Sequence, residues 1–327
     1  MKISPNYTEA QNQESMRKIK KALSARRLFN NWYSLLVKYA LNRIGFHVKL
    51  KAKIDKCYFN IDPNVFARIV SRISHIPIKS VICVGEKLLI NGIEVDDLNN
   101  VIKNHEFWAK LTGWKYDEKC HCWVKDGVKF RHIYDMILRV FGSYGEPQYG
   151  FLNVNGKIVV DVGAYVGDTA IYFALRGAKK IIAIEPHPEA FKEMLDNIKL
   201  NNLANRIIPI NAGLASKPGS ICIKSVDVEE TVGVYHNFGE CDTPIPVITL
   251  ADVINQYHIN DNAILKMNCE GCEFDIIFYS YEHVKVFKEV VFEYHLHQTG
   301  NSLSKLLKIL NKDYHCKVIE KVVLCVR

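Results

Sequence analysis

Residues suited to nucleotide chemistry stand in VVDVGAYVGDTAIYF, residues 159–173, where an apolar run ends near Asp161 and continues into Gly163 and Gly167. A dinucleotide-binding loop has the spacing G-x-G-x-x-G, which lets the backbone approach a pyrophosphate at a helix start. The spacing here is D-x-G-x-x-x-G instead. A carboxylate two residues before the first glycine would repel a phosphate and attract a cation. S-adenosylmethionine offers two cations, an ammonium and a sulfonium.

A second acid, Glu185, ends the next apolar segment, about twenty residues after the glycine loop. An acid at this position of a nucleotide-binding fold accepts hydrogen bonds from ribose hydroxyls. The alternative is that Asp161 and Glu185 cap the helices that follow them, and that the two glycines serve a tight turn. Because all four residues stand at predicted strand ends, the sequence favours a nucleoside ligand, and S-adenosylmethionine over NAD.

The elements that must position these residues alternate regularly after residue 150. Apolar strands are predicted at 157–162, 179–186, 206–214, 263–268 and 288–297, with helices between them at 167–177, 188–202, from about 272, and at 302–310. This order predicts a mostly parallel sheet. The last segment, 314–327, holds two strands with almost nothing between them, so a terminal antiparallel hairpin is expected at one edge. In such sheets ligands bind beyond the carboxyl ends of the strands.

Several successive motifs resemble those of the FkbM-type S-adenosylmethionine-dependent methyltransferases, notably the archaeal ones. They are VVDVGAYVGDTAIYF, IEPHPEAFKEMLDNIKLNN, NAGLAS with PGSICI, VITLADVI, LKMNCEGCEFDII and VVFEYH, within residues 150–297. The resemblance implies a class I methyltransferase Rossmann-like α/β fold with a seven-stranded sheet, and methyl transfer to a hydroxyl of a sugar, lipid-linked glycan or small metabolite. The cofactor-binding residues expected on this basis are Asp161, Gly163, Ala164, Tyr165, Gly167, Asp168, Thr169, Glu185, Pro186, Asn211 and Ala212.

The chain departs from the family pattern at three positions. Asn268 stands where the family usually has Asp, Tyr165 where it has Asn, and Ala251 where it has Asp. A neutral amide at 268 cannot act as a general base and is a poor ligand for a hard divalent ion, so no metal is expected. It can still accept a hydrogen bond from an acceptor hydroxyl. An acid or base must then come from Glu270, Glu273, Glu293 or His295.

We expect Asn268, Glu270 and His295 to be the catalytic residues. Glu270 and Glu273 stand three apart at a helix start, where carboxylates also stabilise the helix dipole, so capping is an equal alternative. Lys266 would be buried in its strand, and a salt bridge to one of these glutamates is expected. His295 and His297 alternate at the end of their predicted strand and so face one side, where His295 either takes a proton near neutral pH or is only a polar strand end.

Two other functions stay open. The segment NIKLNNLANRIIPINAG resembles archaeal tRNA guanine methyltransferases, and the basic N-terminal half suits an RNA partner. Against this, residues 268–271 read Asn-Cys-Glu-Gly in place of the proline-containing motif of those enzymes, and glutamates would repel phosphates. The second alternative is a non-catalytic binding protein on a methyltransferase fold.

The sequence predicts two regions, a mixed α/β accessory or substrate-side region at 1–145 and the cofactor domain at 146–327. The segment FGSYGEPQYG, 141–150, is the expected hinge. In the first region, hairpins are predicted at Asn91-Gly92 and at Asp126-Gly127, and a helix over roughly 97–113. Much of the net charge of +8 lies in RKIKKALSARR, 17–27, which we interpret as a solvated helix face.

The expected localisation is cytoplasmic, because the first fifteen residues lack a signal-peptide pattern and no apolar run is long enough to span a membrane. The ten cysteines are accordingly expected as buried thiols. Zinc binding by Cys120, Cys122, Cys269 and Cys272 is a minor alternative. A small molecule or glycan is the expected partner, nucleic acid is less favoured, and homo-oligomerisation stays open.

Overall fold

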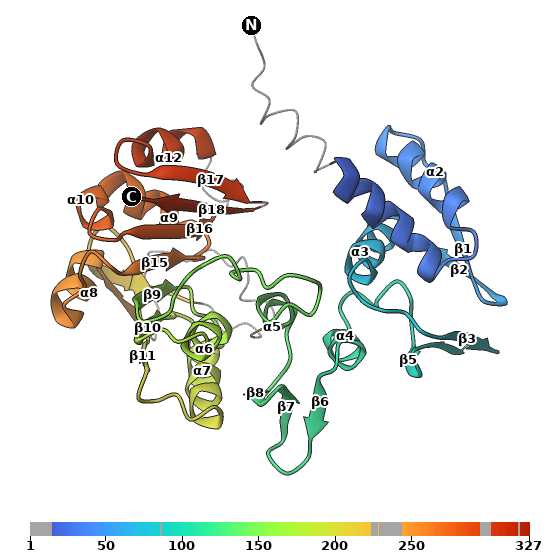
Figure 1. The fold of residues 1–327 in the computed structure, drawn as a ribbon, viewed down its shortest axis with the longest axis horizontal. Helices are drawn as coiled ribbons and strands as arrows, with labels where there is room; N and C mark the ends of the chain where they lie inside the picture. Colours follow the sequence, from blue (N-terminus) through green and yellow to red (C-terminus); the bar gives the residue numbers. More distant parts are fainter. Residues whose placement is uncertain (1–14, 86, 224–227, 229–243, 295–301, 320) are drawn as a thin grey trace, which may run out of the picture. The chain divides into compact units, whose positions relative to one another are not determined.

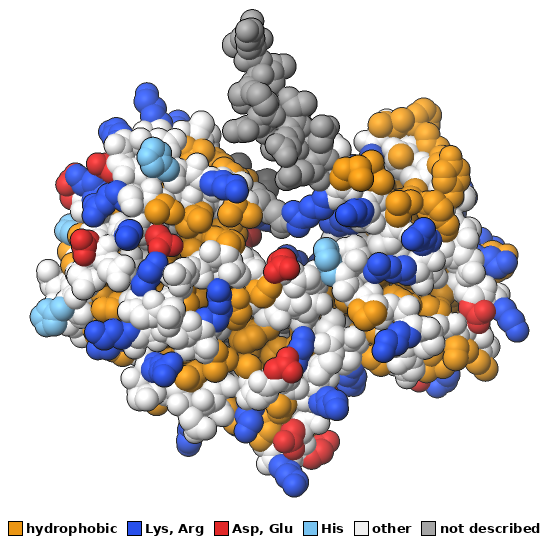
Figure 2. Space-filling view, viewed as in Figure 1, with side chains coloured by type: hydrophobic (Ala, Val, Ile, Leu, Met, Phe, Trp, Pro, Cys, Tyr) orange, Lys and Arg blue, Asp and Glu red, His pale blue; other side chains and the backbone are white. Residues whose placement is uncertain are grey.

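The computed structural model describes residues 15–85, 87–223, 228, 244–294, 302–319 and 321–327. The chain divides into two compact units, one formed by 1–127 with 132–150 and the other by 128–131 with 151–327 (Figure 1). Lysine and arginine side chains are spread over the visible face of both units (Figure 2). Residues 15–23 form an exposed helix that carries part of the basic segment. Within the described ranges, no helix has the length and apolar character needed to cross a membrane.

The first unit contains short helices and antiparallel hairpins. Its elements are η1 (Ser24–Arg27), α2 (Trp32–Arg43), β1 (Leu50–Ile54), β2 (Cys57–Ile61), α3 (Pro63–Ile73), β3 (Val81–Val84), β4 (Lys87–Ile90), β5 (Ile93–Val95), α4 (His105–Leu111), β6 (Lys115–Asp117), β7 (Cys122–Lys125) and α5 (Asp135–Val140). Both predicted hairpin turns are confirmed, since Asn91, Gly92, Asp126 and Gly127 all have positive φ, as two-residue turns require.

The helix predicted over roughly 97–113 is shorter than expected, because α4 begins only at His105. The Asp97 carboxylate accepts hydrogen bonds from the Asn99 backbone N–H at 2.8 Å and from the Asn100 side chain at 2.6 Å. Such local side-chain bonds stabilise turns in competition with a helix. Asn104 then caps α4 by accepting the Phe107 N–H.

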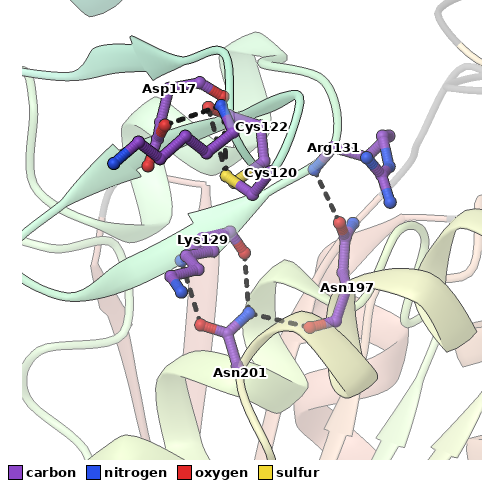
Figure 3. Close-up of a disulfide and its surroundings, with 8 residues drawn as sticks. Asp117, Cys120, Cys122, Lys129, Arg131, Asn197 and Asn201 are labelled. Carbon is purple, nitrogen blue, oxygen red and sulfur yellow. Dashed lines mark hydrogen bonds between the residues drawn. A yellow bond between two sulfur atoms is a disulfide. The ribbon is translucent and has the colours of Figure 1, made fainter.

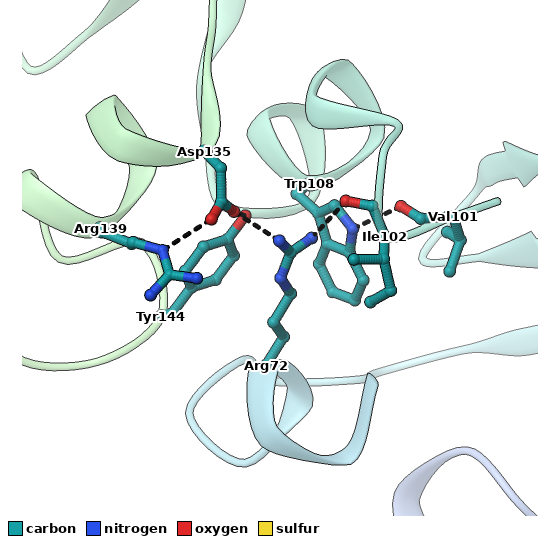
Figure 4. Close-up of polar contacts among 7 residues, drawn as sticks. All are labelled: Arg72, Val101, Ile102, Trp108, Asp135, Arg139 and Tyr144. Atoms are coloured by element: carbon teal, nitrogen blue, oxygen red, sulfur yellow. Dashed lines mark hydrogen bonds and ion pairs between the residues drawn. The ribbon is translucent and has the colours of Figure 1, made fainter. Parts of the chain in front are cut away.

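A buried arginine joins three helices of this unit (Figure 4). The Arg72 guanidinium of α3 lies 4.9 Å from the Trp108 ring centroid and 4.7 Å from that of Tyr144. It donates to the Ile102 carbonyl at 3.0 Å and pairs with Asp135 of α5. These partners come from α3, α4, α5 and the segments beside them, so Arg72 stabilises the packing of this unit.

The second unit is built on a seven-stranded sheet with the order β11-β10-β9-β15-β16-β18-β17, visible as a stack in Figure 1. The strands are β9 (Ile158–Val162), β10 (Lys180–Ile184), β11 (Ile207–Ile210), β15 (Ile264–Met267), β16 (Glu289–Glu293), β17 (His315–Ile319) and β18 (Val322–Val326). Neighbouring strands are parallel from β11 to β16, and β18 pairs antiparallel with both β16 and β17. The predicted class I methyltransferase fold, with its terminal hairpin, is confirmed.

The two faces of this sheet carry different side chains because successive residues of a strand point to opposite faces. Val160 and Val162 belong to an apolar core that also includes residues of four helices: α8 (Leu250–Tyr257), α9 (Cys272–Tyr279), α10 (Tyr281–Val284) and α12 (Leu303–Leu310). Asp161 points to the other face, where it bonds Thr169 of α6 (Asp168–Leu175). The helix α7 (Pro188–Leu200) and a small sheet of β12 (Gly213–Leu214), β14 (Ile245–Ile248) and β13 (Gly219–Ile221) complete the unit.

A strand from before the boundary also belongs to the second unit. The backbone of β8 (Val128–Phe130) and of the residue after it is held by Asn201, the C-cap of α7, and by Asn197 within α7 (Figure 3). The Asn201 side chain accepts the Lys129 N–H at 2.9 Å and donates to the Lys129 carbonyl at 2.6 Å, as a neighbouring strand would. Asn197 accepts the Arg131 N–H at 2.8 Å.

The expectation of buried thiols is wrong. The described cysteines form disulfides, which join Cys57 to Cys83, Cys120 to Cys122 (Figure 3), Cys269 to Cys272, and Cys316 to Cys325. Cys316 and Cys325 lie directly opposite each other in the register of β17 and β18. This register is not visible in the sequence spacing. Because the four cysteines considered for zinc are joined in two disulfides, they offer no thiolates to a metal.

Candidate active site

The glycine loop lies at the point where the strand order of the sheet reverses. From β9 the chain continues to β10 and β11 on one side, whereas β15 and β16 lie on the other side of β9. Ligands of open α/β sheets bind at the carboxyl ends of the strands next to such a reversal. Gly163 follows β9 there, and Asn268 follows β15. A Cβ atom on Gly163 would lie 1.9 Å from the Asn268 carbonyl oxygen, so only glycine fits this crossing.

Hydrogen bonds from the side chains of Glu185 and Asn197 to the loop backbone hold the glycine loop in an unusual conformation. Tyr165 has φ 52°, a left-handed value that costs a non-glycine residue about 1 kcal/mol or more. Its N–H donates to the Glu185 carboxylate at 2.8 Å, a charge-assisted bond that offsets this cost. The Asn197 side chain donates to the Val166 carbonyl at 2.9 Å from α7. Gly167, with φ 84°, is the N-cap residue that precedes α6.

A buried ion pair lies beneath the loop. The Lys266 ammonium is 2.8 Å from the Asp161 carboxylate and donates to the Gly163 carbonyl at 3.0 Å. Thr169 donates to the other Asp161 oxygen at 2.6 Å. The sequence had suggested Glu270 or Glu273 as the partner of Lys266. The partner is Asp161 because the two residues are opposite each other in the parallel register of β9 and β15.

Glu185 joins the loop after β10 to the glycine loop. One carboxylate oxygen accepts the Tyr165 N–H and the other accepts the His187 N–H, each at 2.8 Å. Burial raises the pKa of Glu185 to about 7, although both backbone hydrogen bonds lower it. The Asn211 side chain donates to the carbonyls of Glu185 and Pro186 at 2.9 and 3.1 Å, which fixes the segment that presents the acid.

A second acid in this region is also buried. Burial raises the pKa of Asp168 to about 7; Lys266 opposes this shift and Asp161 adds to it. The buried carboxyl groups of Asp161, Asp168 and Glu185 interact electrostatically with Lys266, whose ammonium is buried as well. Within the described residues, the site is short of positive charge. A ligand that brings an ammonium and a sulfonium fits this imbalance, and each Glu185 oxygen retains a lone pair for a ribose hydroxyl.

Asn268 is the residue expected to contact the substrate that receives the methyl group. Its backbone N–H donates to the Val162 carbonyl at 2.9 Å, and its side-chain oxygen is buried without a hydrogen-bond partner among the residues that the structure describes. A buried acceptor in this state suits a hydroxyl donor from a ligand. His295, also expected here, lies outside the described residues.

The two glutamates after β15 differ in their surroundings. The Glu273 carboxylate is fully buried and accepts the N–H groups of Cys269 and Gly271 at 2.8 Å each. Glu273 therefore stabilises the loop before α9, in agreement with the alternative that it caps the helix. Glu270 has φ 55° and is half-buried within this loop. The disulfide between Cys269 and Cys272 closes the same loop.

His187 and Asn197 also belong to this site, although the sequence motifs did not indicate them. Both are buried polar residues, and His187 caps α7 by accepting the Ala190 N–H at its Nδ1. The sequence signal was the segment Pro186-His187-Pro188, because proline is favoured at the first position of a helix and a polar residue precedes it as the cap. Asn197 carries no comparable signal, since its partners come from two distant segments.

Comparison with known proteins gives partial matches. Residues 161–316 match the methyltransferase FkbM domain. The chain is 35% identical over 88 residues to the ribosomal protein L11 methyltransferase of Geobacter sp. (strain M21), covering 25% of this chain and 29% of that protein. It is 33% identical over 133 residues to a tRNA (guanine(37)-N(1))-methyltransferase of Methanocaldococcus jannaschii, covering 37% of this chain and 36% of that protein. The chain thus spans about a third of these relatives.

Solved structures include similar folds at low identity. The methyltransferase FkbM of Methylobacillus flagellatus KT is 16% identical, with a TM-score of 0.38, over 59% of this chain and 48% of that one. TrmK of M. capricolum, solved with S-adenosylhomocysteine, is 12% identical, with a TM-score of 0.35, over 55% of this chain and 64% of that one.

Proposed function

We propose that the chain transfers a methyl group from S-adenosylmethionine to a hydroxyl of a sugar, lipid-linked glycan or small metabolite, as a member of the methyltransferase FkbM family, whose domain residues 161–316 match. The supporting observation is which residues lie at the point where the strand order reverses. The glycine loop follows β9, and Glu185 follows β10 on one side of it. Asn268, whose side-chain oxygen has no partner among the described residues, follows β15 on the other side. Residues 146–327 would form the cofactor domain, and residues 1–145 would determine which acceptor is used.

The cofactor, when bound, supplies a methyl group already activated on a sulfonium. The protein therefore has mainly to bind and orient, which supplies much of the rate. Glu185 accepts the ribose hydroxyls, and the ion pair of Asp161 with Lys266 keeps the glycine loop in place. Asn268 accepts a hydrogen bond from the hydroxyl of the methyl acceptor and orients the hydroxyl oxygen.

Proton removal needs another group, because an amide is not a base. Glu270 and His295 are the residues proposed for it, and a positioned base contributes about 10²- to 10⁴-fold. The reaction needs no metal in this scheme. A neutral residue at 268 is accordingly compatible with catalysis.

A second candidate is methylation of RNA. The similarity to a tRNA methyltransferase of M. jannaschii supports it. The loop after β15 suits this alternative less well, since the half-buried Glu270 would repel a phosphate backbone. We therefore rank a hydroxyl of a sugar, lipid-linked glycan or small metabolite first.

The test combines binding with methyl transfer, using the full chain. Calorimetry in the presence of chelator should show binding of S-adenosylmethionine and S-adenosylhomocysteine. Methyl-tritiated S-adenosylmethionine is then added to extracts of a strain that lacks the gene, and label is measured in glycan, lipid, small-molecule, RNA and protein fractions. Glu185→Ala is the control for specific transfer. Binding of NAD in preference to S-adenosylmethionine would overturn the proposal, and label confined to RNA or protein would overturn the acceptor class.

A further inference from the structure

Helix α2 of the first unit is apolar on two faces. Its inner face includes Leu35, which is fully buried, and Tyr39, whose ring centroid lies 5.9 Å from that of Phe66 in α3. The other face carries four exposed side chains at the spacing of successive helical turns, namely Tyr33, Val37, Ala40 and Ile44. A helix on a protein surface normally presents polar residues to water, so we expect this outer stripe to contact a partner.

The outer stripe continues past the end of α2 into a loop whose backbone is held by hydrogen bonds. The Phe46 N–H donates to the Leu41 carbonyl at 3.0 Å. The Asn42 side chain donates to the Val48 carbonyl at 2.8 Å and accepts the Val48 N–H at 3.2 Å. In this conformation Ile44 is 71% exposed and Phe46 is 59% exposed.

A second apolar stripe lies on the helix of residues 15–23. Its members are also exposed and at helical spacing, namely Met16, Ile19 and Leu23. The η1 helix that follows packs against both α2 and α3, and its Ser24 donates to the Val70 carbonyl at 3.0 Å. The two stripes therefore belong to one packed group of helices. Figure 2 shows hydrophobic side chains gathered at the upper right, over the part of the chain that Figure 1 labels α2.

The sequence around both stripes is strongly basic. Residues 15–54 contain seven lysines and four arginines, and no aspartate or glutamate. Lys20 and Lys21 are exposed on the first helix, and Lys51 is exposed on β1. The Asn31 side chain, at the start of α2, donates to the Lys51 carbonyl at 2.8 Å and so fixes β1 beside this helix. Positive charge next to exposed apolar side chains complements a membrane surface that contains anionic lipids.

Two other partners would use only part of this surface. RNA would pair with the lysines and arginines, but its phosphates offer no favourable contact to an aliphatic stripe. A second copy of the chain would cover the stripe, but it brings the same positive charge, which opposes association. Helix α2 has 12 residues, a length that suits a helix lying in the membrane interface rather than crossing the bilayer.

We propose that α2, the loop after it and the helix of residues 15–23 form a membrane-docking surface, which binds bilayers containing anionic lipids and inserts its apolar stripes among the headgroups. Docking goes beyond the proposed methyl transfer and does not depend on it. It would bring the protein to lipid-linked acceptors, one of the acceptor classes proposed above.

The test is co-sedimentation of the full chain with vesicles in the absence of S-adenosylmethionine. The protein should bind phosphatidylcholine vesicles that contain phosphatidylserine, bind pure phosphatidylcholine more weakly, and lose affinity as the salt concentration rises. Ile44→Ser with Phe46→Ser should lower the affinity for anionic vesicles about tenfold or more, because each large apolar side chain contributes roughly tenfold when fully buried. Lys20→Gln with Lys21→Gln should lower it about tenfold or more and leave the affinity for pure phosphatidylcholine unchanged.

Matched controls are available on the second unit. Tyr279→Ser with Val318→Ser removes two exposed apolar side chains, and Lys308→Gln with Lys312→Gln removes two exposed charges. Both control variants should bind vesicles like the wild type, and circular dichroism checks that every variant folds. Hydrogen exchange of the wild-type protein needs no variant, since the amides of residues 43–48 should exchange more slowly when anionic vesicles are added.

Failure of the wild-type protein to bind anionic vesicles overturns the proposal, and so does wild-type affinity in Ile44→Ser with Phe46→Ser, or unchanged exchange of residues 43–48. A dimer in light scattering that this variant dissociates, without vesicle binding, would assign the surface to a second copy of the chain. Retention of RNA that both test variants lose, without vesicle binding, would assign it to RNA. None of these results contradicts the proposed methyl transfer, which cofactor binding tests separately.

Discussion

The buried acids of the cofactor site should make the stability of the ligand-free protein depend on pH. Glu185 and Asp168 both have a pKa raised to about 7, from ordinary values of 4.5 and 3.8. A folded-state pKa above the unfolded value means that folding disfavours the ionised group. The free energy of unfolding is thus highest, as far as these two acids are concerned, below about pH 4, and it falls as the pH rises through 7.

The size of the effect follows from proton linkage. Between pH 5.5 and pH 8 the unfolded chain gains little further ionisation at these acids, whereas the folded protein must ionise each of them. The free energy of unfolding should therefore fall by about 2 kcal/mol for each acid over this interval. Urea denaturation of the ligand-free protein at both pH values measures this difference.

A single variant isolates the contribution of Glu185. In Glu185→Gln the difference between pH 5.5 and pH 8 should shrink by about 2 kcal/mol, because the amide does not titrate. The affinity of the wild-type protein for S-adenosylmethionine should rise up to about tenfold from pH 6 to pH 8, since the ionised acids suit a cationic ligand. A wild-type stability that is the same at pH 5.5 and pH 8, or a variant with the full wild-type difference, would refute this reasoning.

Three further predictions concern the strand reversal. Asn268→Asp should preserve or raise methyl transfer to a hydroxyl while Asn268→Ala lowers it; an equally severe loss in both variants would argue against a hydroxyl acceptor. Lys266→Met should lower the free energy of unfolding by about 3 to 5 kcal/mol, because it leaves Asp161 as an uncompensated buried charge, and adding Asp161→Asn should recover part of that loss in urea denaturation. Gly163→Ala should abolish S-adenosylhomocysteine binding or folding, measured by calorimetry and circular dichroism, since its Cβ would overlap the Asn268 carbonyl; normal binding would contradict the role given to this glycine.

Much of the fold could be predicted because local sequence patterns determine it. The buried strands from β9 to β16 are apolar runs, and the hairpins at Asn91-Gly92 and Asp126-Gly127 use residues that tolerate positive φ. The third predicted strand, 206–214, is divided instead. Asn211 leaves the sheet to bond the carbonyls of Glu185 and Pro186, and β12 then pairs with β14 in another sheet.

The pairings across the sheet could not be predicted, because they depend on strand register. Lys266 and Asp161 are 105 positions apart in sequence, and nothing local indicates that they are opposite each other. The glutamates that the sequence offered to Lys266 come after the end of β15, and Glu273 bonds the loop backbone there. The same reasoning applies to Cys316 and Cys325, which become neighbours only when β17 and β18 pair.

The ion pair changes the role of the acid that first suggested the ligand. The cation beside Asp161 is Lys266, and Asp161 is fully buried, so its charge is already balanced inside the protein. Its contribution to a bound cation would then be indirect, through the position of the Gly163 carbonyl that Lys266 also bonds. Glu185 and Asp168 differ because no described ion pair neutralises them. For a cationic cofactor, these two acids are therefore the residues whose ionisation should control affinity.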